Sequence, residues 1–156
     1  MDNSIIFRSF AEDDIPEVLG IYNYYVNNGL ENFEERALSS INFLKLYKNI
    51  IHNKLPFIIC ENSNQIVGFA YLNNFRKKSG YRFSFEDTIY IDKKFSGKGI
   101  GTKLLSTLIE SSKKNTNIKT IIAVIGGNKP NASIEIHKKN GFNMVGVLKK
   151  VGFKKN

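Results

Sequence analysis

The chain has 156 residues, which is the size of one domain, and we expect a single domain over residues 1–156. Its hydrophobic fraction of 42% is typical of a globular protein, and no apolar stretch reaches the roughly 20 residues that a membrane span needs. The net charge of +9 would suit a polyanionic ligand, but the lysines are scattered and are not interleaved with aromatic residues, so neither nucleic acid nor a membrane is an expected partner.

The first part of the chain predicts one strand and two helices. The N-terminus, MDNSIIFRSF, lacks the pattern of a signal peptide, and residues 5–8 predict a short strand. An acidic turn followed by Pro16 is typical of a helix start, and apolar residues then recur at helical spacing as far as Val26. After a loop, Ser39 or Ser40 is expected to cap a second amphipathic helix.

The sequence from Pro56 onwards predicts most of the strands of a sheet. The runs PFIICE and QIVGFAYL flank a polar turn, as in a hairpin, and a third strand is expected near residues 81–92. Cys60, the single cysteine, lies in the first of these runs and is expected to be a core residue of a cytoplasmic protein. After a glycine-rich turn and a helix come a buried strand (119–125), a short helix (about 132–139) and a last strand (near 142–151). This order predicts an α+β fold with a mixed sheet.

The stretch TIYIDKKFSGKGIGTKLLSTLIE carries the strongest functional signal. A strand runs into Gly97, Gly99 and Gly101 and then directly into a helix. Glycines let the backbone approach a phosphate, and the first-turn N–H groups of a helix favour an anion. A P-loop is excluded because Thr102 precedes Lys103, and the spacing of the glycines does not fit the dinucleotide fingerprint. A turn that needs glycine only for its shape is the alternative.

The turn at residues 96–101 resembles the pyrophosphate motif R/Q-x-x-G-x-G/A of the GCN5-related N-acetyltransferases (GNAT), with Ser96 in place of the Arg or Gln. Five further segments resemble the phosphinothricin N-acetyltransferase branch of that family: IYNYYV, NFEE, PFIICE through GFAYL, FRKKSGYRFSFEDTIYID and AVIGGNKPNASIEIHKKNGF. The resemblance covers about residues 5–152. It implies a three-layer fold whose twisted sheet splays between strands 4 and 5, N-acetyltransferase activity, acetyl-CoA as co-substrate and no metal.

The resemblance also implies where the coenzyme binds. The backbone of Ile89, Tyr90 and Ile91 would hold the pantetheine arm, and Asn131 and Ser133 match an Asn-x-Ser contact to the same arm. A helix cap is the other interpretation of Asn131. The residues expected to bind the pyrophosphate are Gly97, Lys98, Gly99, Ile100, Gly101 and Thr102.

Acetyl transfer to an amine needs a base, a donor to the carbonyl oxygen and an acid for the thiolate. Glu86 matches the acidic position of the family and is the candidate base, whereas Asp87 should point to the opposite face of the strand. His137 stands where this branch usually carries His and is the candidate acid. The donor expected from the family is a backbone N–H of Tyr90 or Ile91. A solvated carboxylate at Glu86 and a structural His137 are the alternatives.

Acceptor binding is predicted at two places. Arg76, Tyr81 and Arg82 match the pattern FR-x-R-x-A-Y-R, and cations there would hold a carboxylate or phosphinate, unless they are simply solvated. Phe33 and Glu34 match an early FE and would wall the pocket. The expected acceptors are phosphinothricin, methionine sulfoximine or methionine sulfone, in a detoxifying role. Acetylation of a polyamine, antibiotic or protein amine, and a non-catalytic CoA-binding sensor, are the alternatives. Relatives usually have a further Trp- and Asp-containing strand, and its absence here leaves the acceptor and a homodimer open.

Overall fold

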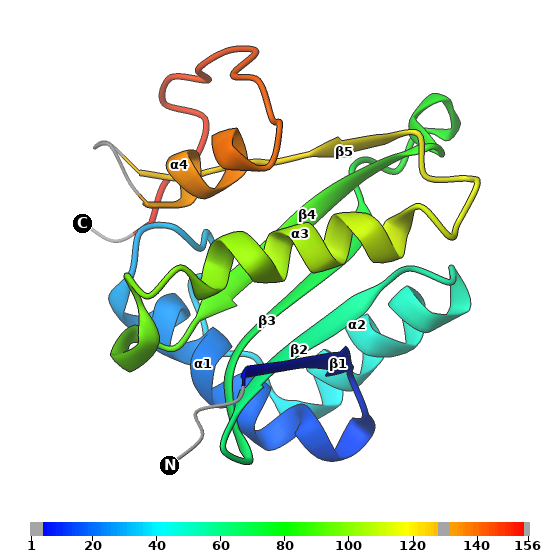
Figure 1. Cartoon of the computed structure of the whole chain (residues 1–156). Helices are drawn as coiled ribbons and strands as arrows, with labels where there is room; N and C mark the ends of the chain where they lie inside the picture. The colour runs from blue at the N-terminus through cyan, green and yellow to red at the C-terminus, as the bar shows by residue number, and fades with distance from the viewer. Residues whose placement is uncertain (1–4, 128–131, 155–156) are drawn as a thin grey trace.

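The computed structural model describes residues 5–127 and 132–154 (Figure 1). Within these ranges one sheet has the strand order β1-β2-β3-β4-β5, antiparallel as far as β4 and parallel between β4 and β5. The strands are β1 (Ile5–Ser9), β2 (Phe57–Asn62), β3 (Gln65–Asn74), β4 (Ser84–Ile91) and β5 (Thr120–Ile122). The α-helices are α1 (Ile15–Asn28), α2 (Ser40–His52), α3 (Ile100–Ser112) and α4 (Ala132–Lys139).

The helices begin and end where local chemistry predicts. Pro16 lies in the first turn of α1, and the helix ends as the Gly29 N–H bonds the carbonyl of Tyr25 at 2.9 Å. The Ser39 hydroxyl caps α2 by accepting from the N–H of Asn42 at 3.3 Å. None of the helices in the described ranges has both the length and the apolar character needed to cross a bilayer.

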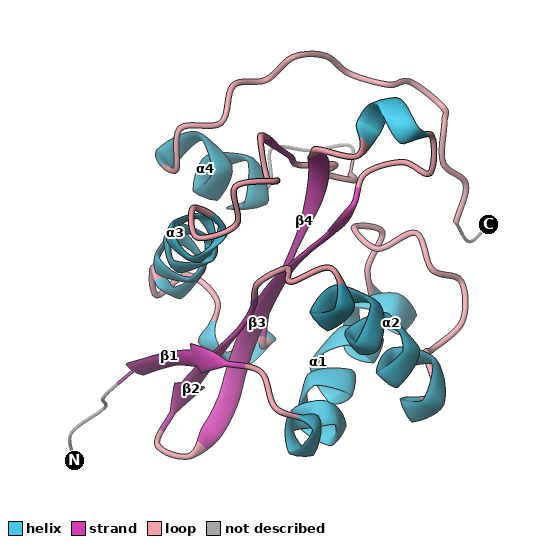
Figure 2. Ribbon diagram, turned by 90° about the vertical axis from the view of Figure 1, so that its right-hand side faces the viewer, coloured by secondary structure: helices cyan, strands magenta, loops and turns pink. Residues whose placement is uncertain are grey.

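The sheet lies between two pairs of helices. Figure 2 shows α1 and α2 on one face and α3 and α4 on the other. β3 is the centre of this arrangement, because seven consecutive residues, Ile66–Leu72, are buried. The predicted three-layer α+β fold is confirmed.

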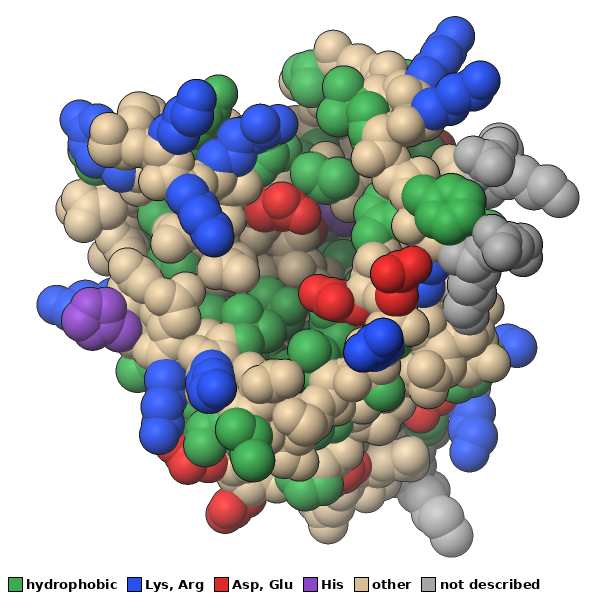
Figure 3. Space-filling model, turned by 180° about the vertical axis from the view of Figure 1, so that it is seen from behind, with side chains coloured by type: hydrophobic (Ala, Val, Ile, Leu, Met, Phe, Trp, Pro, Cys, Tyr) green, Lys and Arg blue, Asp and Glu red, His purple; other side chains and the backbone are tan. Residues whose placement is uncertain are grey.

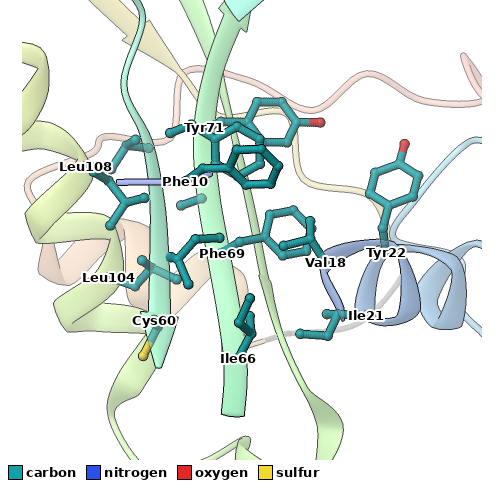
Figure 4. Close-up of a cluster of buried hydrophobic side chains, with 14 of the residues drawn as sticks. Phe10, Val18, Ile21, Tyr22, Cys60, Ile66, Phe69, Tyr71, Leu104 and Leu108 are labelled. Carbon is teal, nitrogen blue, oxygen red and sulfur yellow. The ribbon is translucent and has the colours of Figure 1, made fainter. Parts of the chain in front are cut away.

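The core is built on both faces of β2 and β3. Leu104 and Leu108 of α3 pack on one face and Val18 of α1 lies towards the other, close to Phe69 (Figure 4). Cys60 is fully buried in this core, and burial raises the pKa of its thiol to about 11. A thiol that stays protonated at neutral pH is a poor nucleophile, so Cys60 serves as a small apolar residue, as predicted.

The sheet opens between β4 and β5. Their parallel pairing covers only three residue pairs and ends with Glu86 opposite Ile122. β4 continues five residues further, to Ile91, while residues 123–127 leave the sheet without regular structure. The splay expected between the fourth and fifth strands is therefore present.

Two expected strands are corrected. The strand expected over residues 119–125 is formed only at Thr120–Ile122. The last strand expected near 142–151 does not form: residues 142–154 are irregular, and most of their apolar side chains, such as Val145 at 98% exposure, face solvent. A strand needs a neighbour for its N–H and C=O groups, and the three residues of β5 offer too short an edge.

Phe43 tests the packing of α2 on the sheet. Its side chain is fully buried and its ring centroid lies 6.2 Å from those of Phe10 and Phe57. We expect Phe43→Ala to lower the free energy of unfolding by about 3–5 kcal/mol in urea titration. Ile41→Ala, on the same helix but 69% exposed, is the control and should change it by less than about 0.5 kcal/mol. Equal losses in the two variants would contradict this packing.

Candidate active site

A cleft of about 720 Å³ occupies the opening of the sheet. This volume lies within the range of small-molecule sites. Its walls come from α1, the loop of residues 31–34, β4, the glycine turn, the chain after β5 and α4. Figure 3 shows a hollow on the back of the molecule with acidic side chains on its rim.

The glycine turn forms one end of the cleft. Gly97 and Gly99 have φ angles of +78° and +76°, which favour glycine, and a Cβ atom at either position would meet no atom within 4 Å. The backbone of the turn is therefore open to a ligand. α3 starts at Ile100, so its first amides have no partners within the helix and can bind an anion. Ile100, Gly101 and Thr102 all line the cleft.

Gly101 has a second reason to be glycine. A Cβ atom there would lie 2.7 Å from the Cδ1 atom of Ile136, so the missing side chain lets α3 pack closely on α4. The turn therefore has positions where glycine is required by backbone shape or close packing, and its predicted role in binding the pyrophosphate is compatible with this.

The cations around the turn are not all placed as expected. The ammonium of Lys98 lies 5.0 Å from the centroid of the Phe95 ring, and Lys98 is not among the residues that line the cleft. Lys139, at the end of α4, lines it instead. Sequence reasoning missed Lys139, because the docking of α4 beside the turn depends on tertiary packing. Ser133 also lines the cleft, whereas Asn131 lies outside the described residues.

The end of β4 forms a second wall, which includes Ile89, Tyr90 and Ile91. The hydroxyl of Tyr25 donates to the carbonyl of Ile91 at 2.6 Å and so fixes the last residue of the strand. Tyr90 packs against Tyr25 and Tyr22, with ring centroids 5.0 and 5.6 Å away. The segment IYNYYV, noted for its resemblance alone, therefore supplies an aromatic floor to the cleft.

Glu86 lies where β4 loses its partner strand. Its carboxylate is half-buried on the cleft wall. Burial and the neighbouring Asp87 carboxylate raise the pKa of Glu86 above its usual value of 4.5. A carboxylate in such a position suits a base that takes a proton from an amine.

Asp87 also lines the cleft, although an ideal strand would turn it away from Glu86. From the opposite facing of Asp87 we expected only Glu86 to line the cleft, and this is wrong, because both carboxylates belong to its wall where β4 has lost its partner strand. Asp87 is buried and its Oδ2 atom lies 2.9 Å from Nε2 of His137.

Both ring nitrogens of His137 are engaged. Nδ1 lies 2.6 Å from the carbonyl oxygen of Ser133, which can only accept, so Nδ1 carries a proton. Burial opposes charge on the ring, but Asp87 and the Ser133 carbonyl outweigh it and raise the pKa of His137. The imidazole thus ties α4 to β4 across the opening. Its role as the acid stays a prediction.

The residues expected to bind the acceptor fall into two groups. Phe33 and Glu34 line the cleft. Arg76, Tyr81 and Arg82 do not: they lie in the connection between β3 and β4, around the short 3-10 helix Ser79–Tyr81. There the Arg76 guanidinium lies 5.2 Å from the centroid of the Phe75 ring, and Arg82 donates to the carbonyl of Ser79 at 3.2 Å. Their predicted role stays a prediction.

The profile of the acetyltransferase (GNAT) domain family matches residues 7–156. The chain belongs to the GNAT family. This GNAT enzyme is 34% identical, over 147 residues, to the phosphinothricin N-acetyltransferase of Alcaligenes faecalis, a match that covers 94% of this chain and 74% of that protein. It is 28% identical, over 152 residues, to the L-methionine sulfoximine/L-methionine sulfone acetyltransferase of Pseudomonas aeruginosa, covering 97% of this chain and 87% of that protein.

Solved structures support the same family assignment. The crystal structure of a GNAT phosphinothricin acetyltransferase from Sinorhizobium meliloti in complex with acetyl-CoA matches with a TM-score of 0.90 and 34% identity, covering 96% of this chain and 80% of that one. The protein is therefore an N-acetyltransferase with acetyl-CoA as its co-substrate. The open backbone of the glycine turn fits the pyrophosphate of such a coenzyme. Among the residues described here, no group of three or more His, Cys, Asp and Glu side chains is arranged to hold a metal ion.

The His137–Asp87 pair predicts a pH-dependent stability. Because the pKa of His137 is raised in the folded protein, the pair stabilises fully below pH 6.5, and this contribution is lost as the pH rises through the raised value. We expect Tm, followed by circular dichroism, to fall more steeply above pH 6.5 in the wild type than in His137→Gln. His52→Gln, at the exposed end of α2, should keep the wild-type slope. Identical slopes in the wild type and His137→Gln would show that the ring is not held as a cation.

Proposed function

We propose that the acceptor is the primary amine of a small amino-acid-like compound of the phosphinothricin, methionine sulfoximine or methionine sulfone type. The observation that carries this proposal is the similarity of nearly the whole chain to two relatives named for these acceptors. The cleft has the size of a site for a small molecule and a coenzyme arm, and a carboxylate with a raised pKa stands on its wall.

Glu86 is assigned the role of base. The reaction breaks the bond between the acetyl carbon and the coenzyme sulfur and forms a bond from that carbon to the amine nitrogen. An ammonium has no free electron pair, so it must first lose a proton, which Glu86 takes directly or through a water molecule. A second proton leaves the nitrogen as the amide forms, and the coenzyme sulfur gains one proton.

The wall of β4 is assigned the role of stabilising negative charge on the carbonyl oxygen. The backbone N–H of Tyr90 or Ile91 is the proposed donor, since both residues line the same cleft four and five positions after Glu86 on β4. The hydrogen bond from Tyr25 to the carbonyl of Ile91 holds this part of the backbone in place before the substrates arrive.

One observation favours a second candidate, a polyamine or another amine without an acidic group. Among the described residues that line the cleft, Lys139 is the single lysine and there is no arginine. The glutamates on its walls are Glu31, Glu34, Glu86 and Glu135. Carboxylates attract an ammonium group, but an acceptor that also carries a carboxylate needs a cation, which Lys139 or the predicted Arg76 and Arg82 would have to supply.

The acceptor is tested by free-thiol release from acetyl-CoA. The panel contains phosphinothricin, methionine sulfoximine, methionine sulfone, the common amino acids, spermidine and an aminoglycoside. We expect release with at least one of the first three compounds at a higher kcat/KM than with spermidine. Release with spermidine or the aminoglycoside alone would replace the proposed acceptor with the second candidate.

If Glu86 is the base, its substitution should lower kcat, and the wild-type kcat/KM should depend on pH. Glu86→Gln should lower kcat by about 10²–10⁴-fold and leave the affinity for acetyl-CoA, measured by calorimetry, unchanged. In the wild type, kcat/KM should fall on acidification at a pH above 4.5, because the deprotonated carboxylate is the active form and its pKa is raised. The exposed Glu110→Gln is the control. A Glu86→Gln variant with the wild-type kcat would exclude this base.

A further inference from the structure

The loop of residues 31–34 brings three side chains to the cleft around a buried asparagine. Asn32 is only 5% exposed, and its Oδ1 atom accepts from the N–H of Glu34 at 2.8 Å. Hydrogen bonding to Asn32 also opposes the rise that burial causes in the pKa values of Tyr22 and Tyr90, so the amide lies beside both hydroxyls. The inner side of this loop therefore rests on the aromatic floor of the cleft.

The far end of the chain holds the same loop from the other side. Lys154 is 7% exposed, and its ammonium group donates to the backbone carbonyl of Asn32, 122 residues away in sequence. Two positions before it, a Cβ atom at Gly152 would lie 2.9 Å from two atoms of the Phe33 ring. The ring packs directly on the backbone of this segment, which no larger residue would allow without movement.

A third segment completes the enclosure. A Cβ atom at Gly126, in the chain that follows β5, would lie 3.3 Å from Cζ of Phe33 and 3.3 Å from the carbonyl oxygen of Glu31. The loop is thus held between the segment after β5 and the C-terminal segment. Of the contacts that hold the loop, the one from Lys154 is a hydrogen bond from a charged group. Burying an ammonium group is costly unless it makes such a hydrogen bond.

We propose that Lys154 is a positioning residue for the acceptor side of the cleft. By holding the carbonyl of Asn32 it fixes the loop, so that Glu31, Phe33 and Glu34 form a wall of constant shape next to the acceptor. The inference rests on the proposed function in one respect, that the amine binds on this side of the cleft. The Lys154 ammonium bonds the carbonyl of Asn32 in the loop, so we expect its loss to affect binding of the amine more than binding of the coenzyme.

Hydrogen exchange tests the mechanical part of the proposal without any acceptor. In Lys154→Met, amides of residues 30–36 should exchange about tenfold faster or more, because a charged hydrogen bond that limits local opening is lost, whereas β2 and β3 should keep their protection. Lys149→Met, an exposed lysine in the same irregular segment, is the matched control and should exchange like the wild type. Unchanged exchange of the loop in Lys154→Met would overturn the proposal.

Steady-state kinetics tests the functional part. With the best acceptor from the panel, Lys154→Met should raise the KM for the amine by about tenfold and change the KM for acetyl-CoA by less than about twofold. Gly152→Ala, which keeps Lys154 but displaces the Phe33 ring, should show the same split. Equal increases in both KM values would mean a general loss of structure and would overturn the positioning role. If no amine in the panel reacts, the proposed function fails, while the exchange measurement still decides the role of Lys154 in holding the loop.

Discussion

The candidate site depends on one constraint: the hydrogen-bonded pairing of β4 with β5 stops after three residue pairs. β4 and β5 are paired for three residues and then separate, and beyond that point the free edge of β4 must find partners other than a strand. The cleft exists because a strand of eight residues lies beside one of three. Glu86 stands at the last paired position, so the candidate base is held by regular sheet structure on one side and faces the opening on the other.

An opening in a sheet has to be kept at a fixed width. The hydrogen bond between His137 and Asp87 joins α4 to β4 across the opening. The close packing of Gly101 against Ile136 holds α4 against α3. The first of these contacts is buried, and the second places the backbone of Gly101 against a half-buried side chain. They leave the glycine turn and the unpaired edge of β4 accessible to a ligand while limiting how far α4 can move.

Features set by local chemistry could be predicted from the sequence. The helix starts at Pro16 and Ser39 depend on neighbouring residues, and the three alternating glycines before α3 predicted an anion-binding turn. The contacts of the site could not be predicted in the same way. Asp87 meets His137 across 50 positions, and Lys154 meets Asn32 across 122, so only the folded arrangement shows these pairs. The expected last strand failed for the same reason: its residues have the right composition, but whether a free edge awaits them depends on where β5 ends.

The aromatic floor of the cleft has a practical consequence. The chain contains no tryptophan, so its intrinsic ultraviolet emission comes from its seven tyrosines. Four of them line the cleft: Tyr22, Tyr25, Tyr71 and Tyr90. No indole ring competes for this emission, and the majority of the residues that produce it lie on the walls of the cavity. A ligand that enters this cleft would contact these rings, so we expect its binding to change the tyrosine emission of the unmodified chain.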